Sequence, residues 1–145
     1  MSGKARLTVV TLGVRDFARS LRFYEALGFE RKFRKTGDEV AFIDAGGVVL
    51  ALWHWQLLAE DEVLPPDPVS PYRGISLAWN CKTDEEVDAA FARAIAAGAT
   101  SLRPPSPTDY GGYRGYFADP DGHAWELVRA PGFDFTEDGR LILPD

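Results

Sequence analysis

The chain has 145 residues, a formal net charge of −6 at neutral pH and an isoelectric point near 4.9. A chain of this length usually forms one domain and is long enough to bury a hydrophobic core. Hydrophobic residues make up 46% and charged residues 26% of the sequence, a composition that argues against disorder of the main body. The acidic balance argues against a general nucleic-acid-binding protein, because contacts to phosphates need clustered Lys and Arg.

The sequence also indicates where the protein works. No apolar run approaches the ~20 residues that a membrane-spanning helix needs, and the first residues lack the apolar segment of a signal peptide. Cys81 is the single cysteine, so neither an intrachain disulfide nor a cysteine-based metal cluster can form. We therefore expect a cytoplasmic protein that does not bind membranes.

The first half of the chain predicts a strand, a helix and three more strands. Residues 6–14 are rich in β-branched side chains, which favour strands. Asp16 follows as a helix N-cap, apolar residues then recur at helical spacing, and Gly28 ends the helix. Three short apolar runs, separated by turn residues, complete this half: residues 29–33, 40–43 and 48–53.

The second half repeats that order after a loop rich in Pro and acidic residues. An apolar run at residues 74–81 predicts a strand, and Thr83 opens a capping box for a helix that ends at Gly98. Asp-Pro-Asp-Gly at residues 119–122 is a strong tight-turn signal and joins the last two of the strands that follow. These strands are expected at residues 100–103, 112–117 and 123–128.

The duplicated βαβββ order predicts an α+β fold in a single domain. Module one covers about residues 6–56 and module two about 73–130, with a linker at about 57–72 between them and a surface tail at 131–145. A ferredoxin-like αβ sandwich, which also mixes short strands with two helices, is the structural alternative. It requires fewer strands than this pattern contains.

Two local signatures resemble the vicinal-oxygen-chelate superfamily, the group of glyoxalases, bleomycin-resistance proteins and extradiol dioxygenases. The first contains a Phe-Tyr pair at residues 23–24 and a Leu-Gly helix end at 27–28. The second is the Asp-Pro-Asp-Gly turn at 119–122, which leads into a strand that carries Glu126. The resemblance covers roughly residues 6–130. It implies two modules that form a curved, mostly antiparallel, eight-stranded, open barrel-like sheet around a cavity.

The resemblance also implies where a metal would bind. Metal-dependent members of the group take ligands, usually His and Glu, from the first and fourth strands of each module. These positions fall near Val9, Ala51, Gly74 and Glu126. Val, Ala and Gly have no side-chain donor, and one carboxylate cannot hold a catalytic divalent ion firmly. We therefore expect no cofactor, and a divalent metal is the alternative if the ligand positions are shifted.

Strand alternation places several aromatic and polar side chains on the faces that carry these positions. Trp55 is assigned to the face of Ala51, whereas Trp79 and Trp125 are expected to face the helices. A pocket lined by aromatic side chains with a few polar groups is typical of small-molecule sites, although large aromatic residues are also ordinary core material. The expected ligand-binding residues are Trp53, Ser76, Asn80, Arg114, Tyr116 and Glu126.

Glu126 is the candidate catalytic residue, either as a general base or as the group that holds a cationic ligand. Its structural alternative is an ion pair with Arg114 across the final hairpin. His54 is expected to face away from the cavity and His123 to hydrogen-bond the hairpin, so neither is assigned to metal binding or acid–base catalysis. Cys81 has no base near it in the sequence and is not expected to be a nucleophile.

These observations favour a metal-free protein that binds a small molecule, in the manner of the drug-sequestering members of the group. The alternative is an enzyme, a lyase, isomerase or dioxygenase that uses Glu126 with or without a divalent metal. A structural or protein-interaction module is the third hypothesis. The resemblance further implies a homodimer, because those relatives form dimers.

Overall fold

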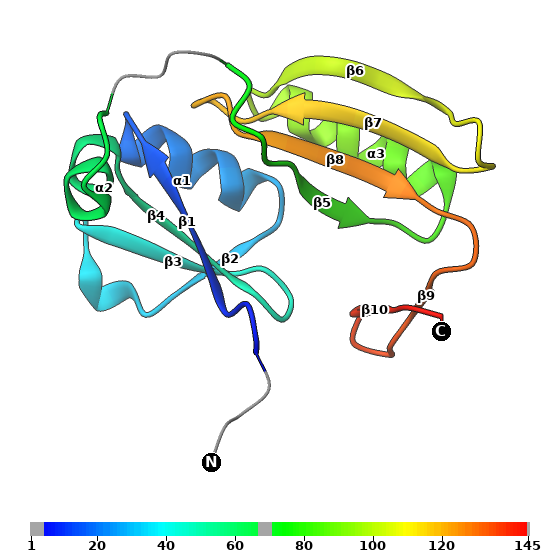
Figure 1. The fold of residues 1–145 in the computed structure, drawn as a ribbon, viewed down its shortest axis with the longest axis horizontal. Coiled ribbons are helices and arrows are strands. Elements are labelled where there is room, and N and C mark those ends of the chain that lie inside the picture. Colours follow the sequence, from blue (N-terminus) through cyan, green and yellow to red (C-terminus); the bar gives the residue numbers. More distant parts are fainter. Residues whose placement is uncertain (1–4, 67–70, 145) are drawn as a thin grey trace.

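The computed structural model describes residues 5–66 and 71–144 (Figure 1). The first half contains β1 (Val9–Val14), α1 (Phe17–Ala26), β2 (Glu30–Lys32), the short 3-10 turn η1 (Arg34–Thr36), β3 (Val40–Asp44), β4 (Val49–His54) and α2 (Trp55–Glu62). The second half contains β5 (Leu77–Asn80), α3 (Asp84–Ala96), β6 (Thr100–Pro107), β7 (Tyr113–Ala118), β8 (Ala124–Arg129), β9 (Asp134–Phe135) and β10 (Leu141–Ile142). Residues 67–70, in the middle of the expected linker, lie outside the described residues.

Each half folds into its own four-stranded sheet, in the orders β1-β4-β3-β2 and β5-β8-β7-β6. In both sheets the first strand pairs in parallel with the fourth strand along the chain, β1 with β4 and β5 with β8. The other neighbouring strands are antiparallel. The α+β class and the duplicated βαβββ order are confirmed. The eight strands form two separate sheets, which are not closed into a barrel (Figure 1).

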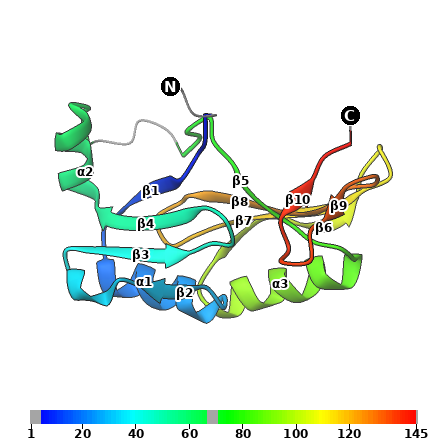
Figure 2. The ribbon, with the colours of Figure 1, turned by 90° about the horizontal axis from the view of Figure 1, so that it is seen from below.

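Helices α1 and α3 lie on the same side of the two sheets, so the protein has two layers (Figure 2). Alternate residues of each strand point toward these helices and form the core between the layers. The largest fully buried hydrophobic side chains are Tyr24, Phe23, Phe117, Ile43, Leu52, Leu127, Val14 and Val87. We call the opposite side of the sheets the upper face. Helix α2 rises from one margin of this face, and the β9–β10 hairpin lies beyond the β5 edge of the second sheet (Figures 1 and 2).

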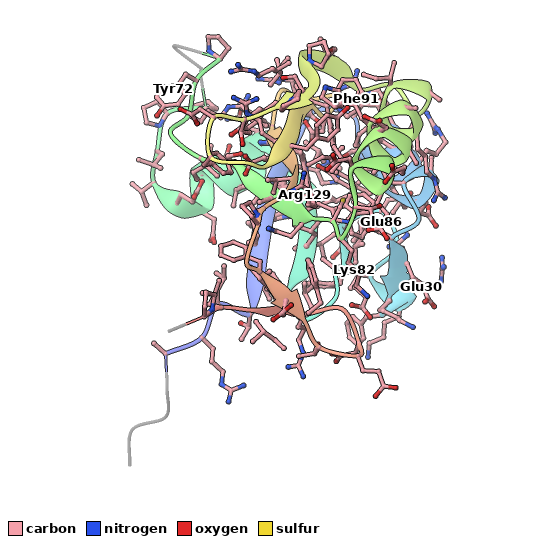
Figure 3. The ribbon with its side chains drawn as sticks, turned by 90° about the vertical axis from the view of Figure 1, so that its right-hand side faces the viewer. Glu30, Tyr72, Lys82, Glu86, Phe91 and Arg129 are labelled. Carbon is pink, nitrogen blue, oxygen red and sulfur yellow. The ribbon has the colours of Figure 1, made fainter. Side chains whose placement is uncertain are left out.

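The start of α3 follows the predicted capping pattern with one difference. Thr83 Oγ1 accepts a hydrogen bond from the Glu86 N–H, as expected for an N-cap. The Glu86 carboxylate accepts the N–H of Lys82, one residue before the cap, instead of that of Thr83. Arg129 at the end of β8 donates to Asp84 Oδ1 over 2.7 Å and ties this end of the helix to the sheet (Figure 3).

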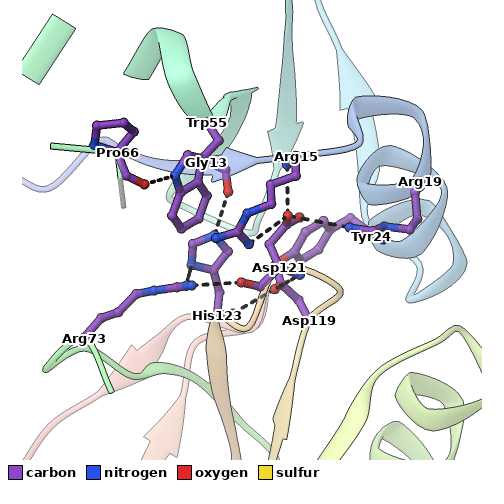
Figure 4. Close-up of polar contacts among 10 residues, drawn as sticks. All are labelled: Gly13, Arg15, Arg19, Tyr24, Trp55, Pro66, Arg73, Asp119, Asp121 and His123. Atoms are coloured by element: carbon purple, nitrogen blue, oxygen red, sulfur yellow. Dashed lines mark hydrogen bonds and ion pairs between the residues drawn. The ribbon is translucent and has the colours of Figure 1, made fainter. Parts of the chain in front are cut away.

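A buried cluster of hydrogen bonds joins the two modules (Figure 4). The Tyr24 hydroxyl on α1 donates to Asp119 Oδ2 over 2.6 Å, and the Trp125 indole N–H donates to the same hydroxyl over 3.2 Å. Asp119 Oδ1 accepts the backbone N–H groups of Asp121 and His123. Burial and then the charge of Asp119 raise the pKa of Tyr24 well above its usual value, so its hydroxyl stays protonated and can donate.

The same turn also reaches the end of β1 (Figure 4). Asp121 Oδ1 accepts the backbone N–H of Arg15 over 2.9 Å and lies 3.8 Å and 3.6 Å from the guanidinium groups of Arg15 and Arg19. His123 Nε2 lies 2.8 Å from the carbonyl oxygen of Gly13. The turn between β7 and β8 is therefore held by both β1 and α1, across the boundary between the modules.

Two expectations about the boundaries of elements were wrong. The loop expected from about residue 57 begins with helix α2, whose residues Gln56, Leu57, Leu58, Ala59 and Glu60 are good helix formers. The strand expected from Gly74 starts three residues later, at Leu77. The tail also contains the two-stranded β9–β10 sheet. Within residues 5–66 and 71–144, no helix has the length and the apolar character needed to cross a membrane.

The buried junction predicts an unequal effect of removing two tyrosine hydroxyls. Tyr24→Phe leaves a buried carboxylate oxygen and a buried indole N–H without their partner, so we expect the free energy of unfolding to fall by about 1.5–3 kcal/mol. Tyr113→Phe removes the exposed hydrogen bond to Asp88, which competes with water, and is expected to have a much smaller effect. Chemical denaturation of both variants checks this. Equal losses would contradict the role assigned to the junction.

Candidate functional site

The upper face of the second sheet carries four of the six expected ligand-binding residues. Core residues Phe117 and Leu127 point toward the helices, so their neighbours on β7 and β8 point to the upper face. Two rows of paired residues cross this part of the sheet, Ala78–Glu126–Tyr116 and Asn80–Val128–Arg114. We call Arg114, Tyr116 and Glu126 the upper-face cluster.

The Glu126 carboxylate is bound by Tyr116 and not by Arg114. The Tyr116 hydroxyl donates to Glu126 Oε2 over 3.0 Å. Burial, and then the hydrogen bond to the Glu126 carboxylate, raise the pKa of Tyr116, so this hydroxyl remains a donor at neutral pH. The Arg114–Glu126 ion pair, the structural alternative for Glu126, is absent from the described contacts, and Arg114 pairs with Val128, one row away.

Arg114 contributes a cation with one buried nitrogen that no described residue satisfies. Its Nη1 is buried, and no described residue accepts a hydrogen bond from it. The guanidinium lies close enough to Tyr116 to oppose the rise in the pKa of that hydroxyl. A buried donor without an acceptor is costly, so it marks a position where a bound molecule would stabilise the protein.

Two expected residues lie apart from this cluster. Trp53 belongs to the first sheet, where it pairs with Gly13 and Val40. Ser76 is exposed and precedes β5, so it is not part of a row in the second sheet. The structure therefore brings together Arg114, Tyr116 and Glu126, with Asn80 one row from Glu126.

The register moves two of the expected metal positions. Ala51 pairs with Thr11 on β1, and Glu126 pairs with Ala78 on β5, so these are the equivalent sites in the two modules. Val9 pairs with Val49 instead, and Gly74 lies outside the strand.

The donors at these four positions do not fit a catalytic divalent ion. One hydroxyl and one carboxylate are too few for a firm site. Across the described part of the chain, no group of three or more His, Cys, Asp or Glu side chains is arranged to hold a metal. No step of a reaction is therefore assigned to a metal here.

Trp55, which strand alternation assigned to the face of Ala51, belongs to a second feature of the structure. Trp55 is the first residue of α2 and lies outside the strand. It lines a cavity of about 530 Å³ between the modules, which we call the inter-module cavity. Arg73 and His123 also line this cavity, and neither was among the expected site residues. Among the described lining residues, none of the six expected ligand-binding residues occurs.

Trp79, Trp125 and His54 lie on the faces that strand alternation predicts. Trp79 and Trp125 pack against Phe29 on the helix side, with ring centroids 5.7 Å and 5.9 Å away. The ring of His54 stacks on Phe17 at the start of α1, on the same side. The His123 backbone N–H donates to Asp119 within the hairpin, as expected. Its ring also contacts the carbonyl oxygen of Gly13 in the other module.

Comparison with known proteins decides the family. A family model described as Glyoxalase/Bleomycin resistance protein/Dioxygenase superfamily matches residues 6–127. The chain belongs to this superfamily. The two signatures that suggested it, the Phe-Tyr pair and the Asp-Pro-Asp-Gly turn, meet in the buried bond between Tyr24 and Asp119. In this member of the superfamily they therefore hold the two modules together.

Solved structures of the superfamily share this fold. The chain is similar to a glyoxalase-related enzyme from Fulvimarina pelagi, with 37% sequence identity and a TM-score of 0.84 over 97% of this chain and 99% of that chain. A glyoxalase/bleomycin resistance protein/dioxygenase from Nocardioides is 28% identical, with a TM-score of 0.69 over 91% of this chain and 88% of that chain. A lactoylglutathione lyase from Agrobacterium tumefaciens, 21% identical over 91% of this chain and 100% of that chain, shares the fold with a TM-score of 0.68. No match was found among curated proteins.

Cys81 is predicted to be an unreactive thiol. Burial, with a smaller contribution from Glu86, raises its pKa from 9.0 to about 11. At pH 8 the folded protein should hold about a hundredfold less thiolate than an ordinary thiol, and Ellman's reagent should react correspondingly slowly. Above pH 9 the unfolded chain ionises first, so stability should fall as the pH rises toward 11. Reaction of the folded protein at the rate of free cysteine would contradict this; guanidinium-unfolded protein is the control.

Proposed function

We propose that this superfamily member binds a small organic molecule at the upper-face cluster, without a resident metal. The observation that carries the proposal is the buried Arg114 Nη1, which no described residue satisfies, on the same face of the sheet as the carboxylate of Glu126. A ligand that offers an acceptor to Arg114 and a donor to the Glu126 carboxylate would complement both groups.

The surroundings of the cluster support binding by shape and hydrogen bonds. Small or apolar residues, Ala78 and Val128, occupy the same rows, so a ligand can approach the polar groups closely. Glu126, Tyr116 and Arg114 are all partly buried. Side chains in such positions lose less bound water when a ligand binds than fully exposed side chains do. The donor set at the four equivalent strand positions supports a site that works without a metal.

An enzyme remains the second candidate, and one contact favours it. The Tyr116 hydroxyl keeps its proton and hydrogen-bonds the Glu126 carboxylate, so the pair can orient a substrate while Glu126 accepts a proton from it. The similar protein from Fulvimarina pelagi is described as a glyoxalase-related enzyme. Turnover that is lost in Glu126→Gln would favour this candidate over binding alone.

Two further properties are proposed on the basis of the superfamily resemblance and the sequence. We propose that the protein forms a homodimer, as the resemblance implies. We also propose that it acts in the cytoplasm, where its single, buried thiol would stay reduced.

The upper-face site predicts which residues control binding. A thermal-shift screen of antibiotics, bleomycin included, and of small polar metabolites should give a ligand whose affinity falls by about tenfold or more in Glu126→Gln and in Arg114→Met. Each substitution removes a charged group that would bond the ligand and leaves the surrounding packing nearly unchanged.

Matched substitutions on the helix side provide the control. Glu25 and Arg22 are exposed on α1, so Glu25→Gln and Arg22→Met change the same charges away from the cluster. These variants should bind the ligand like the unmodified protein. Unchanged affinity in Glu126→Gln and Arg114→Met would show that the upper-face cluster is not the binding site.

A further inference from the structure

The inter-module cavity has the size and surface of a ligand site in its own right. Its volume of about 530 Å³ falls within the range of roughly 300–1,000 Å³ that is usual for small-molecule pockets. One wall is β1, a second is α2, and the start of β8 and the segments on either side of residues 67–70 complete it. These elements come from both modules, so the cavity exists only where the modules meet (Figure 1).

Most of the surface of this cavity is apolar. Its lining includes Leu58 and Ala59 of α2, Val10 and Leu12 of β1, and several proline residues. Gly13 allows the close approach of the helix, because a Cβ at that position would lie 3.3 Å from the Trp55 ring. Such a surface favours a ligand with an apolar part, because binding removes apolar surface from water and the surface offers few hydrogen bonds.

The polar groups gather near the first residue of α2 (Figure 4). The Arg73 guanidinium lies 5.0 Å from the centre of the Trp55 ring, and its Nη2 donates to the carbonyl oxygen of Asp121. The Trp55 indole N–H is already used, since it donates to the carbonyl oxygen of Pro66. Arg73 also contacts His123 Nδ1 over 2.8 Å through Nη1.

His123 cannot provide a further donor in this arrangement. Its Nε2 faces the carbonyl oxygen of Gly13, which only accepts, so the ring proton lies on Nε2. Its Nδ1 is then the acceptor for Arg73. The two described hydrogen bonds use two of the five N–H groups of Arg73, so its guanidinium can still donate to a ligand.

A carboxylate at the other end of α2 makes the two ends of the cavity opposite in charge. Glu62 lines the cavity and is the last residue of the helix, whereas Arg73 lies beside Trp55, the first residue. At 1.5 Å per residue, these two ends of α2 are roughly 10 Å apart. A negative group is therefore favoured near Arg73 and disfavoured near Glu62.

We infer that the inter-module cavity binds an amphipathic monoanion, an apolar chain or ring that carries a single carboxylate held by Arg73. This site is separate from the upper-face cluster, since Arg114, Tyr116 and Glu126 do not line the cavity. A carboxylate matches the guanidinium because it can accept two parallel N–H bonds. The apolar body would lie along α2 and β1.

Isothermal titration with decanoate, decan-1-ol and decylammonium tests this inference on the whole chain. We expect one decanoate per chain, with weaker binding of the alcohol and the weakest binding of the ammonium ion. Arg73→Met should weaken decanoate by about tenfold or more and leave the alcohol unchanged. Absence of saturable decanoate binding, or equal affinity for decanoate and decylammonium, would overturn the inference.

Filling the cavity locates the bound molecule. Leu58→Trp places a larger side chain in the cavity and should abolish decanoate binding, whereas Leu57→Trp, at the exposed neighbouring residue, should not. Ile75 is 69% exposed and also lines the cavity, so Ile75→Trp gives a second filling variant with little risk to folding. Full binding by both filling variants would overturn the inference.

Glu126→Gln separates this inference from the proposed function. Glu126 does not line the cavity, so its substitution should leave decanoate binding unchanged. Loss of decanoate binding in that variant would place the molecule at the upper-face cluster and overturn the inference. Loss of the antibiotic or metabolite ligand in Glu126→Gln, with decanoate binding retained, would support two sites.

Discussion

The arrangement of the two modules depends on the buried carboxylate of Asp119. One of its oxygens accepts the Tyr24 hydroxyl of the first module, and the other accepts the backbone N–H groups of Asp121 and His123 in its own turn. A carboxylate is stable at such a position only when hydrogen bonds replace its water. Asp119 closes the hairpin of β7 and β8, so the contact that positions the modules also fixes the hairpin that carries Glu126.

This constraint separates the fold of the superfamily from its chemistry. The sequence signatures of the family lie at the junction, where Tyr24 meets Asp119, and remain intact. The strand positions that could hold a metal lie on the upper face, where side chains can change without disturbing the core. In this chain Thr11, Ala51, Ala78 and Glu126 stand at these positions, and the Glu126 carboxylate accepts the Tyr116 hydroxyl. Membership of the superfamily therefore does not by itself assign a metal-dependent reaction.

The sequence predicted those helices and turns that have strong local signals. It did not predict contacts that depend on the register between strands or on segments far apart in the chain. The caps at Asp16 and Thr83 were correct, because cap preferences act within one turn of a helix. Trp55 was assigned to a strand because alternation was carried one residue past His54, whereas it begins α2. The alternative Arg114–Glu126 ion pair is not among the described contacts, and the two residues lie in different rows, because pairing across β7 and β8 depends on the geometry of their turn. The inter-module cavity has no local signal, because its walls come from segments far apart in the chain.

The central claim is that the superfamily site of this protein works without a metal. A measurement of metal content tests it most directly. Untagged protein would be analysed by inductively coupled plasma mass spectrometry as purified, and again after incubation with nickel, zinc, manganese or ferrous iron and removal of unbound ions. The account predicts only traces of metal per chain, because one carboxylate and one hydroxyl are too few donors. About one firmly held ion per chain, lost in Glu126→Gln, would contradict it and favour a metal-dependent enzyme.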